Sequence, residues 1–138
     1  MIFKRNKRVR ATRVETLEEI EEMAASGRPV LIDFWRTGCQ PCRTMEGIVD
    51  ELADEYHQTA FVAKVDVGRV PGAAQKYAIR STPTFLLLAT STRAKKKAKA
   101  DSGPPRVTQR WRASGLVKKD ALARLLESKG AEPEAGRQ

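Results

Sequence analysis

The chain has 138 residues, of which 41% are hydrophobic and 31% charged, and it carries a formal net charge of +9 at pH 7. This length suits one domain with a buried core, and no stretch approaches the roughly 18 consecutive apolar residues of a membrane span. The basic first residues lead into no apolar segment of an export signal. We therefore expect a cytoplasmic protein with no membrane association, in a reducing compartment.

The positive charge is concentrated in two segments. Residues 1–13 hold six basic and no acidic residues, and residues 93–112 hold eight basic residues and one acidic residue. The rest of the chain has a net charge of −4. We expect a basic N-terminal extension at 1–13, a single domain at 14–129 with a long basic loop at 90–106, and a disordered tail at 130–138. Such runs are usually solvated, although they also bind acidic proteins or polyanions.

The first half of the chain alternates helix and strand signals. Thr16 and Glu19 form a capping box that opens a helix at 17–26. The apolar run 30–35 indicates a buried strand, and apolar residues at three- and four-residue spacing predict a helix at 40–57. Residues 61–67 have the composition of the next strand.

The second half continues the alternation after a short helix. Pro71 suits the first turn of a helix that reaches Tyr77. Two strands are expected at 84–89 and 107–111, followed by a closing helix at 118–128. Strands alternating with helices indicate an α/β domain whose sheet is covered on both faces.

Cys39 and Cys42 stand two residues apart, between the strand at 30–35 and the helix at 40–57. The N–H groups and positive dipole end of that helix favour a thiolate there. A thiol of pKa about 8.5 is roughly 3% ionised at pH 7, whereas one with a pKa of about 7 is half ionised. Because the thiolate attacks disulfides, this spacing predicts a redox-active dithiol.

A zinc site is the alternative for a cysteine pair. Structural zinc usually has four Cys or His ligands, and this chain has two cysteines and the single His57. We expect no metal and no cofactor apart from the redox-active disulfide Cys39–Cys42. His57 is expected on a helix surface away from the thiols.

Asp33 lies within the apolar strand at 30–35. Burying a carboxylate costs several kcal/mol unless it is paired or protonated, so its pKa should rise. A core aspartate with satisfied hydrogen bonds is the structural alternative to a functional one.

Several segments resemble thioredoxin in order and spacing, over about residues 14–128: Val30–Trp35, the Cys39-Gln40-Pro41-Cys42 motif, 52–56, 62–66 and 77–84. The resemblance implies the thioredoxin fold, an α/β fold with a central mixed β-sheet and helices on both faces. The basic loop would lie in its last β-hairpin.

The resemblance also implies roles for individual residues. Cys39 matches the exposed nucleophile, Cys42 the resolving thiol and Asp33 the buried carboxylate that exchanges a proton with it. Pro83 matches a cis-proline that presents the backbone of Thr82 to an extended substrate chain. The substrate-binding residues implied are Trp35, Gly38, Gln40, Pro41, Thr82 and Pro83.

This chain departs from the thioredoxin pattern around the cysteines. Gly38 stands where the family has a tryptophan, Gln40 replaces a glycine, and Gly47 replaces a proline that kinks the helix. Arg36 and Arg43 flank the site, and their charge should lower the thiol pKa. The family's glycine after the last strand is absent unless Gly115 supplies it.

Two functions remain open from the sequence. The first is a thiol–disulfide oxidoreductase that reduces protein disulfides, with protein disulfide substrates, a thiol reductase as electron donor and a monomeric state. The alternative is a binding or adaptor module that docks an acidic protein or nucleic acid through residues 93–112, with weak or regulatory redox activity. The oxidoreductase function is favoured, because the chain contains Cys39, Cys42, Asp33 and Pro83 together.

Overall fold

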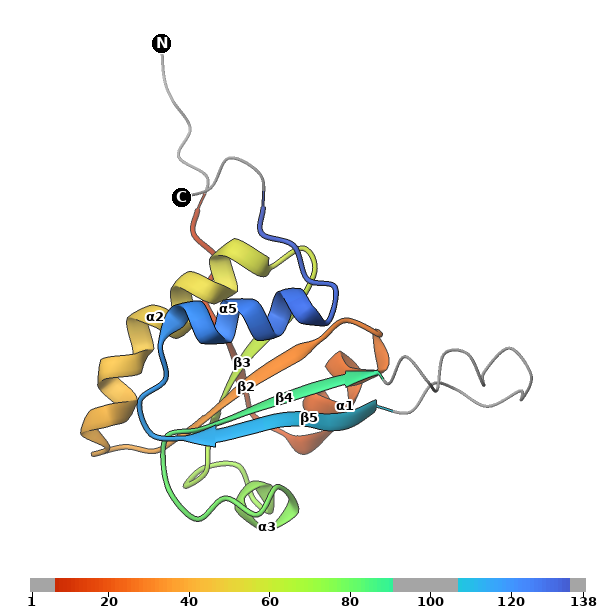
Figure 1. Cartoon of the computed structure of the whole chain (residues 1–138). Helices are drawn as coiled ribbons and strands as arrows, with labels where there is room; N and C mark the ends of the chain where they lie inside the picture. Colours follow the sequence, from red (N-terminus) through yellow and green to blue (C-terminus); the bar gives the residue numbers. More distant parts are fainter. Residues whose placement is uncertain (1–6, 91–106, 135–138) are drawn as a thin grey trace, which may run out of the picture.

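The computed structural model describes residues 7–90 and 107–134 (Figure 1). The expected basic loop at 90–106 lies outside these residues except for Thr90, as do residues 135–138 of the expected tail. The elements, in chain order, are β1 (Thr12–Val14), α1 (Leu17–Ala25), β2 (Val30–Trp35), α2 (Gln40–Tyr56), β3 (Phe61–Asp66), α3 (Ala73–Lys76), β4 (Thr84–Thr90), β5 (Val107–Ser114) and α5 (Lys119–Ser128).

The strands form one mixed sheet in the order β1-β3-β2-β4-β5. β1 and β2 each pair in parallel with β3, whereas β4 is antiparallel to β2 and β5 is antiparallel to β4. The central strand β2 therefore has neighbours on both sides, which agrees with its nearly continuous apolar sequence.

Helices cover both faces of this sheet (Figure 1). α2 and α5 lie on one face, and α1 and α3 lie on the other. Each layer has its own core: Leu31 and Leu52 belong to the α2 and α5 side, whereas Ile20 and Ile32 belong to the α1 and α3 side. The predicted mixed sheet with helices on both faces is confirmed.

α2 places one apolar side on the sheet. Its residues Met45, Val49, Leu52 and Tyr56 recur at three- and four-residue intervals and are buried. Each large aliphatic side chain removed from water contributes roughly 1.5–3 kcal/mol. The helix continues through Gly47 without a break, so this packing holds its N-terminal turn in place at the sheet edge.

The expected boundary between a basic extension at 1–13 and the domain is wrong. Thr12–Val14 is the edge strand β1, and Ala11 and Val14 are buried. Val9 N–H also donates to Asp54 Oδ1 at 2.8 Å. Three residues are too few for a period-two pattern, so the sequence contains no strand signal here.

The expected disordered tail at 130–138 is wrong for residues 130–134. Ala131 is 3% exposed, and Thr59 Oγ1 donates to Glu132 O at 2.8 Å and accepts from Glu132 N–H at 2.9 Å. Glu134 N–H donates to Glu55 O at 2.7 Å. Hydrogen bonds to backbone groups thus hold residues 130–134 to the domain. Because this segment is mostly polar, hydrophobic periodicity could not have revealed it.

Other boundaries differ by a few residues. β5 continues to Ser114, beyond the expected end at residue 111, and α3 begins at Ala73 rather than at Pro71. Residues 107–112 of the basic segment therefore belong to the sheet.

Candidate redox site

The two cysteines lie where β2 leads into α2. Cys39 is the N-cap residue of α2, and Cys42 N–H donates to Cys39 Sγ at 3.2 Å. The two residues form a disulfide with a Cα–Cα distance of 5.3 Å. Cys39 is half-buried and Cys42 is buried, so Cys39 is the more accessible sulfur of the pair. Gln40 and Pro41, in the first turn of α2, are exposed beside them.

Gly38 has a backbone conformation that suits glycine. Its φ angle is 82°, in the left-handed region, and an added Cβ would meet no atom within 4 Å. A side chain at this position would have room but a strained backbone. The exposed turn before Cys39 is therefore bare where the family pattern has a tryptophan.

The segment before β4 faces the cysteines. The Thr82–Pro83 peptide bond is cis, and Cys39 Sγ lies 3.5 Å from Thr82 O. Gly115, directly after β5, donates its N–H to Pro83 O at 2.8 Å and has a φ of 86°. The structure thus brings Cys39, Thr82, Pro83 and Gly115 together from three separate parts of the chain.

Asp33 is buried in β2 on the sheet face that α2 covers, next to Phe85 of β4, with 1% of its surface exposed. Neither of its side-chain oxygens has a hydrogen-bond partner within the described residues. Burial raises the pKa of Asp33 from 3.8 to about 7, against a smaller lowering effect of Lys64. The carboxyl group is therefore close to half protonated near neutral pH, in agreement with the rise expected from its apolar surroundings.

Three further charged residues surround Asp33 and were not singled out from the sequence. Lys64 on β3 is the register partner of Asp33, but its Nζ pairs with Glu46 Oε1 of α2 at 3.3 Å. Glu46 and Asp50 of the same helix also raise the pKa of Asp33. A lysine inside the apolar run 61–67 was the available signal, because an unpaired buried amine is costly.

Trp35, at the end of β2, forms a wall beside the cysteines. Lys64 Nζ lies over its ring, 5.0 Å from the centroid. A hollow of about 260 Å³ next to Cys42, the thiol-side hollow, is lined by Trp35, Arg36, Thr37, Gly38, Cys42, Arg43, Glu46 and Lys64. Arg36 and Arg43 therefore flank the cysteine pair in space as well as in sequence.

His57 lies away from the cysteines, at the C-terminal end of α2. Its Nδ1 is 2.9 Å from Asp54 O and 3.7 Å from Glu134 Oε2. Within residues 7–90 and 107–134, no three His, Cys, Asp or Glu side chains gather closely enough to hold a metal ion. No helix in those ranges has the length and apolar content needed to cross a membrane.

The described residues thus place a disulfide at the N-terminus of a helix, beside a cis-proline, in a mixed five-stranded sheet that also buries a carboxyl group. The family model "Thioredoxin" matches residues 11–104. The chain belongs to the thioredoxin family.

Curated relatives match only part of the chain. Thioredoxin 1 of Synechococcus elongatus is 42% identical over 67 residues, which are 49% of this chain and 63% of that protein. Thioredoxin of Chlorobaculum thiosulfatiphilum is 40% identical over 67 residues, or 49% and 62% of the two chains. The match thus spans less than two thirds of the length of these relatives.

Solved structures match over most of the chain. A mutant thioredoxin from Halobacterium salinarum NRC-1 superposes with a TM-score of 0.68 at 28% identity, covering 91% of this chain and 96% of that one. A thioredoxin of Malassezia sympodialis gives a TM-score of 0.70 over 92% of this chain and 96% of that one. Because its identity is 20%, it supports the fold alone.

Proposed function

We propose that this chain is a thiol–disulfide oxidoreductase that reduces protein disulfides through Cys39 and Cys42. The observation that carries the proposal is the position of the pair at the N-terminus of α2, with Cys39 Sγ 3.5 Å from the carbonyl oxygen of Thr82. A helix N-terminus stabilises a thiolate, and an exposed carbonyl beside it accepts a backbone hydrogen bond from an extended substrate.

In the first step, the Cys39 thiolate attacks one sulfur of the substrate disulfide. The substrate S–S bond breaks, a mixed disulfide forms between Cys39 and the substrate, and the released sulfur takes up a proton. The half-buried position of Cys39 allows this attack, whereas Cys42 is covered. The proposed substrate-binding residues are Trp35, Gly38, Gln40, Pro41, Thr82 and Pro83, of which Pro83 is buried and acts through its cis peptide bond with Thr82.

In the second step, Cys42 loses its proton to the Asp33 carboxylate and attacks Cys39 Sγ. The mixed disulfide breaks, the Cys39–Cys42 disulfide forms, and the second substrate sulfur leaves as a thiolate that takes up a proton from the solvent, to which Asp33 returns the proton of Cys42. Two electrons have then passed from the protein to the substrate disulfide, and both substrate sulfurs have become thiols. A pKa of about 7 suits Asp33 to this exchange, since an effective proton acceptor titrates near the working pH.

The proposal also covers the compartment, the oligomeric state and the electron donor. The protein works as a monomer in a reducing compartment such as the cytoplasm, a thiol reductase returns electrons to the Cys39–Cys42 disulfide, and no cofactor takes part. The adaptor function through residues 93–112 is not favoured, because residues 107–112 belong to β5, which pairs with β4 in the sheet.

Trapping of the intermediate tests the proposal. Cys42→Ser should accumulate mixed disulfides with protein substrates in a cell extract, because no resolving thiol is present, and dithiothreitol should release them. Cys39→Ser and the Cys39→Ser/Cys42→Ser double variant are the matched controls and should trap nothing. Recovery of no adducts with Cys42→Ser would contradict the oxidoreductase function.

The reduction potential distinguishes a reductase from an oxidant. The Cys39–Cys42 pair can be equilibrated in dithiothreitol or glutathione buffers and the free thiols alkylated. A value close to about −270 mV supports a disulfide reductase, whereas one between about −120 and −180 mV would indicate an oxidant or isomerase.

A further inference from the structure

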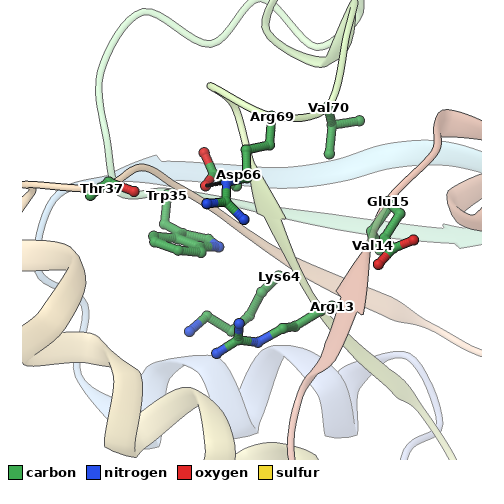
Figure 2. Close-up of a pocket in the computed structure, with 9 residues that line it drawn as sticks. All are labelled: Arg13, Val14, Glu15, Trp35, Thr37, Lys64, Asp66, Arg69 and Val70. Carbon is green, nitrogen blue, oxygen red and sulfur yellow. Dashed lines mark ion pairs between the residues drawn. The ribbon is translucent and has the colours of Figure 1, made fainter.

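A second surface hollow opens beside Trp35, toward the β1 edge of the sheet (Figure 2). This β1-side hollow encloses about 450 Å³ and shares Trp35, Thr37 and Lys64 with the thiol-side hollow. Its remaining walls come from β1 and from the segment after β3, including Arg13 and Arg69. Because Thr37 stands two residues before Cys39, this hollow adjoins the surface on which residues flanking a bound disulfide would lie.

Two positive charges stand next to each other in the β1-side hollow. Arg13 on β1 and Lys64 on β3 are register partners, so both side chains leave the sheet on the same face. Figure 2 shows the two side chains pointing to the same side of the hollow, below Trp35 in this view. Like charges on neighbouring strand positions are unfavourable, so the pair favours an anion between or beside them.

The neighbouring acidic side chains leave Arg13 without compensation. Asp66 is 3.8 Å from Arg69 and also accepts the N–H of Gly68 at 2.9 Å. Glu15 lies on the side of the hollow away from the cationic ends of Arg13 and Lys64 (Figure 2). Lys64 is paired with Glu46, and within residues 7–90 and 107–134 no ion pair or hydrogen bond engages the side chain of Arg13.

The thiol-side hollow adds two more cations of the same kind. Arg36 and Arg43 line it beside Gly38 and Cys42. Neither arginine side chain forms an ion pair in the described part of the chain. Three arginines without an ion-pair partner in the described residues therefore line the two hollows, Arg36 and Arg43 beside the cysteines and Arg13 at the β1 edge, with the Lys64–Glu46 pair between them.

We propose that the two hollows dock acidic side chains of the protein whose disulfide is reduced at Cys39. This inference rests on the proposed function and names its substrate class: disulfides flanked by aspartate or glutamate. A carboxylate bound near Arg13 would relieve the repulsion between Arg13 and Lys64. A nucleic acid suits the surface less well, because Lys64 Nζ already covers one face of the Trp35 ring on which a base would stack.

Two synthetic peptides that share one intramolecular disulfide test the inference. In one the disulfide is flanked by glutamates, and in the other by glutamines. With dithiothreitol as electron donor at low ionic strength, we expect the glutamate peptide to have a kcat/KM about tenfold higher, and added salt to remove the difference. Arg13→Gln should lower kcat/KM for the glutamate peptide by about threefold and leave the glutamine peptide unchanged.

Arg124→Gln is the matched control, because Arg124 is exposed on α5 and lines neither hollow. Arg69→Gln provides a second variant in the β1-side hollow if Arg13→Gln fails to fold. Equal kcat/KM for the two peptides would overturn the inference, and so would equal effects of Arg13→Gln and Arg124→Gln.

Binding of redox-inert peptides separates this inference from the proposed function. Versions with serine in place of both cysteines can be titrated into the oxidised protein and followed by NMR. Failure to reduce either peptide would contradict the oxidoreductase function, whereas tighter binding of the inert glutamate peptide, weakened by Arg13→Gln, would still support the docking surface. A single-stranded oligonucleotide serves as the competing ligand. If it binds more tightly than the inert glutamate peptide, and if Arg13→Gln weakens its binding, the acidic-substrate inference is overturned.

Discussion

Asp33 and Lys64 are register partners on adjacent parallel strands, yet the amine of Lys64 pairs with another carboxylate. Lys64 Nζ lies 3.3 Å from Glu46 Oε1, and neither side-chain oxygen of Asp33 has a hydrogen-bond partner within the described residues. Burial then raises the pKa of Asp33 from 3.8 to about 7. The site therefore contains a buried acid that titrates near neutral pH.

This raised pKa makes stability depend on pH. Between pH 4 and 7 the folded protein keeps the proton on Asp33 while the unfolded chain has lost it, so stability falls as the pH rises through this range. We expect the oxidised Asp33→Asn variant to be more stable than the parent at pH 8, by roughly 2–4 kcal/mol, and to differ little at pH 4. Urea unfolding at the two pH values measures the difference. Glu22→Gln, on the exposed side of α1, is the control and should show no such pH dependence.

Removing the charge of Glu46 should lower the pKa of Asp33. Glu46 raises this pKa directly, and it also holds the Lys64 amine whose charge lowers it. Both effects of Glu46→Gln have the same sign, so the titration of Asp33 should move below pH 7. Carbon-13 NMR of the Asp33 carboxyl group measures it directly. Glu51→Gln is a matched control on the same helix, because Glu51 pairs instead with Lys119 at 3.0 Å. An unchanged or higher Asp33 pKa in Glu46→Gln would contradict the prediction.

The arginines beside the cysteines should stabilise the Cys39 thiolate. Arg36 and Arg43 line the thiol-side hollow, and positive charge near a thiolate lowers its pKa. In the reduced protein, Arg36→Gln and Arg43→Gln should each raise the Cys39 pKa slightly, since both arginines are exposed and their charge is screened. The pH dependence of iodoacetamide alkylation gives this pKa. The prediction fails if both variants titrate like Arg124→Gln.

The segment after α5 should contribute to stability. A chain that ends at residue 129 loses the burial of Ala131 and the two hydrogen bonds between Thr59 and Glu132. We expect it to be about 2 kcal/mol less stable than a chain that ends at residue 134, measured by urea unfolding. Thr59→Val should cost about 1 kcal/mol in the longer chain and little in the shorter one. Equal costs in the two chains would show that Thr59 acts through other contacts.

Local pattern was sufficient for most elements of the fold. The helices α1, α2 and α5 have apolar faces of three- and four-residue spacing, and β2, β3 and β4 are short apolar runs, so their existence follows from the sequence. β1 has three residues and residues 130–134 are mostly polar, so neither has a periodicity that could reveal it. Both are held by contacts with distant segments, which no local pattern encodes.

By itself the sequence determined the cysteine pair, the helix that follows it and a carboxylate within an apolar strand, because each depends on residues close together in the chain. The tertiary structure alone decided which charges meet. The row of Arg13, Lys64 and Asp33 across three strands depends on strand order and register. The pairing of Lys64 with Glu46 depends on how α2 packs on the sheet. Such contacts are set by packing between segments distant in sequence, so spacing along the chain cannot specify them.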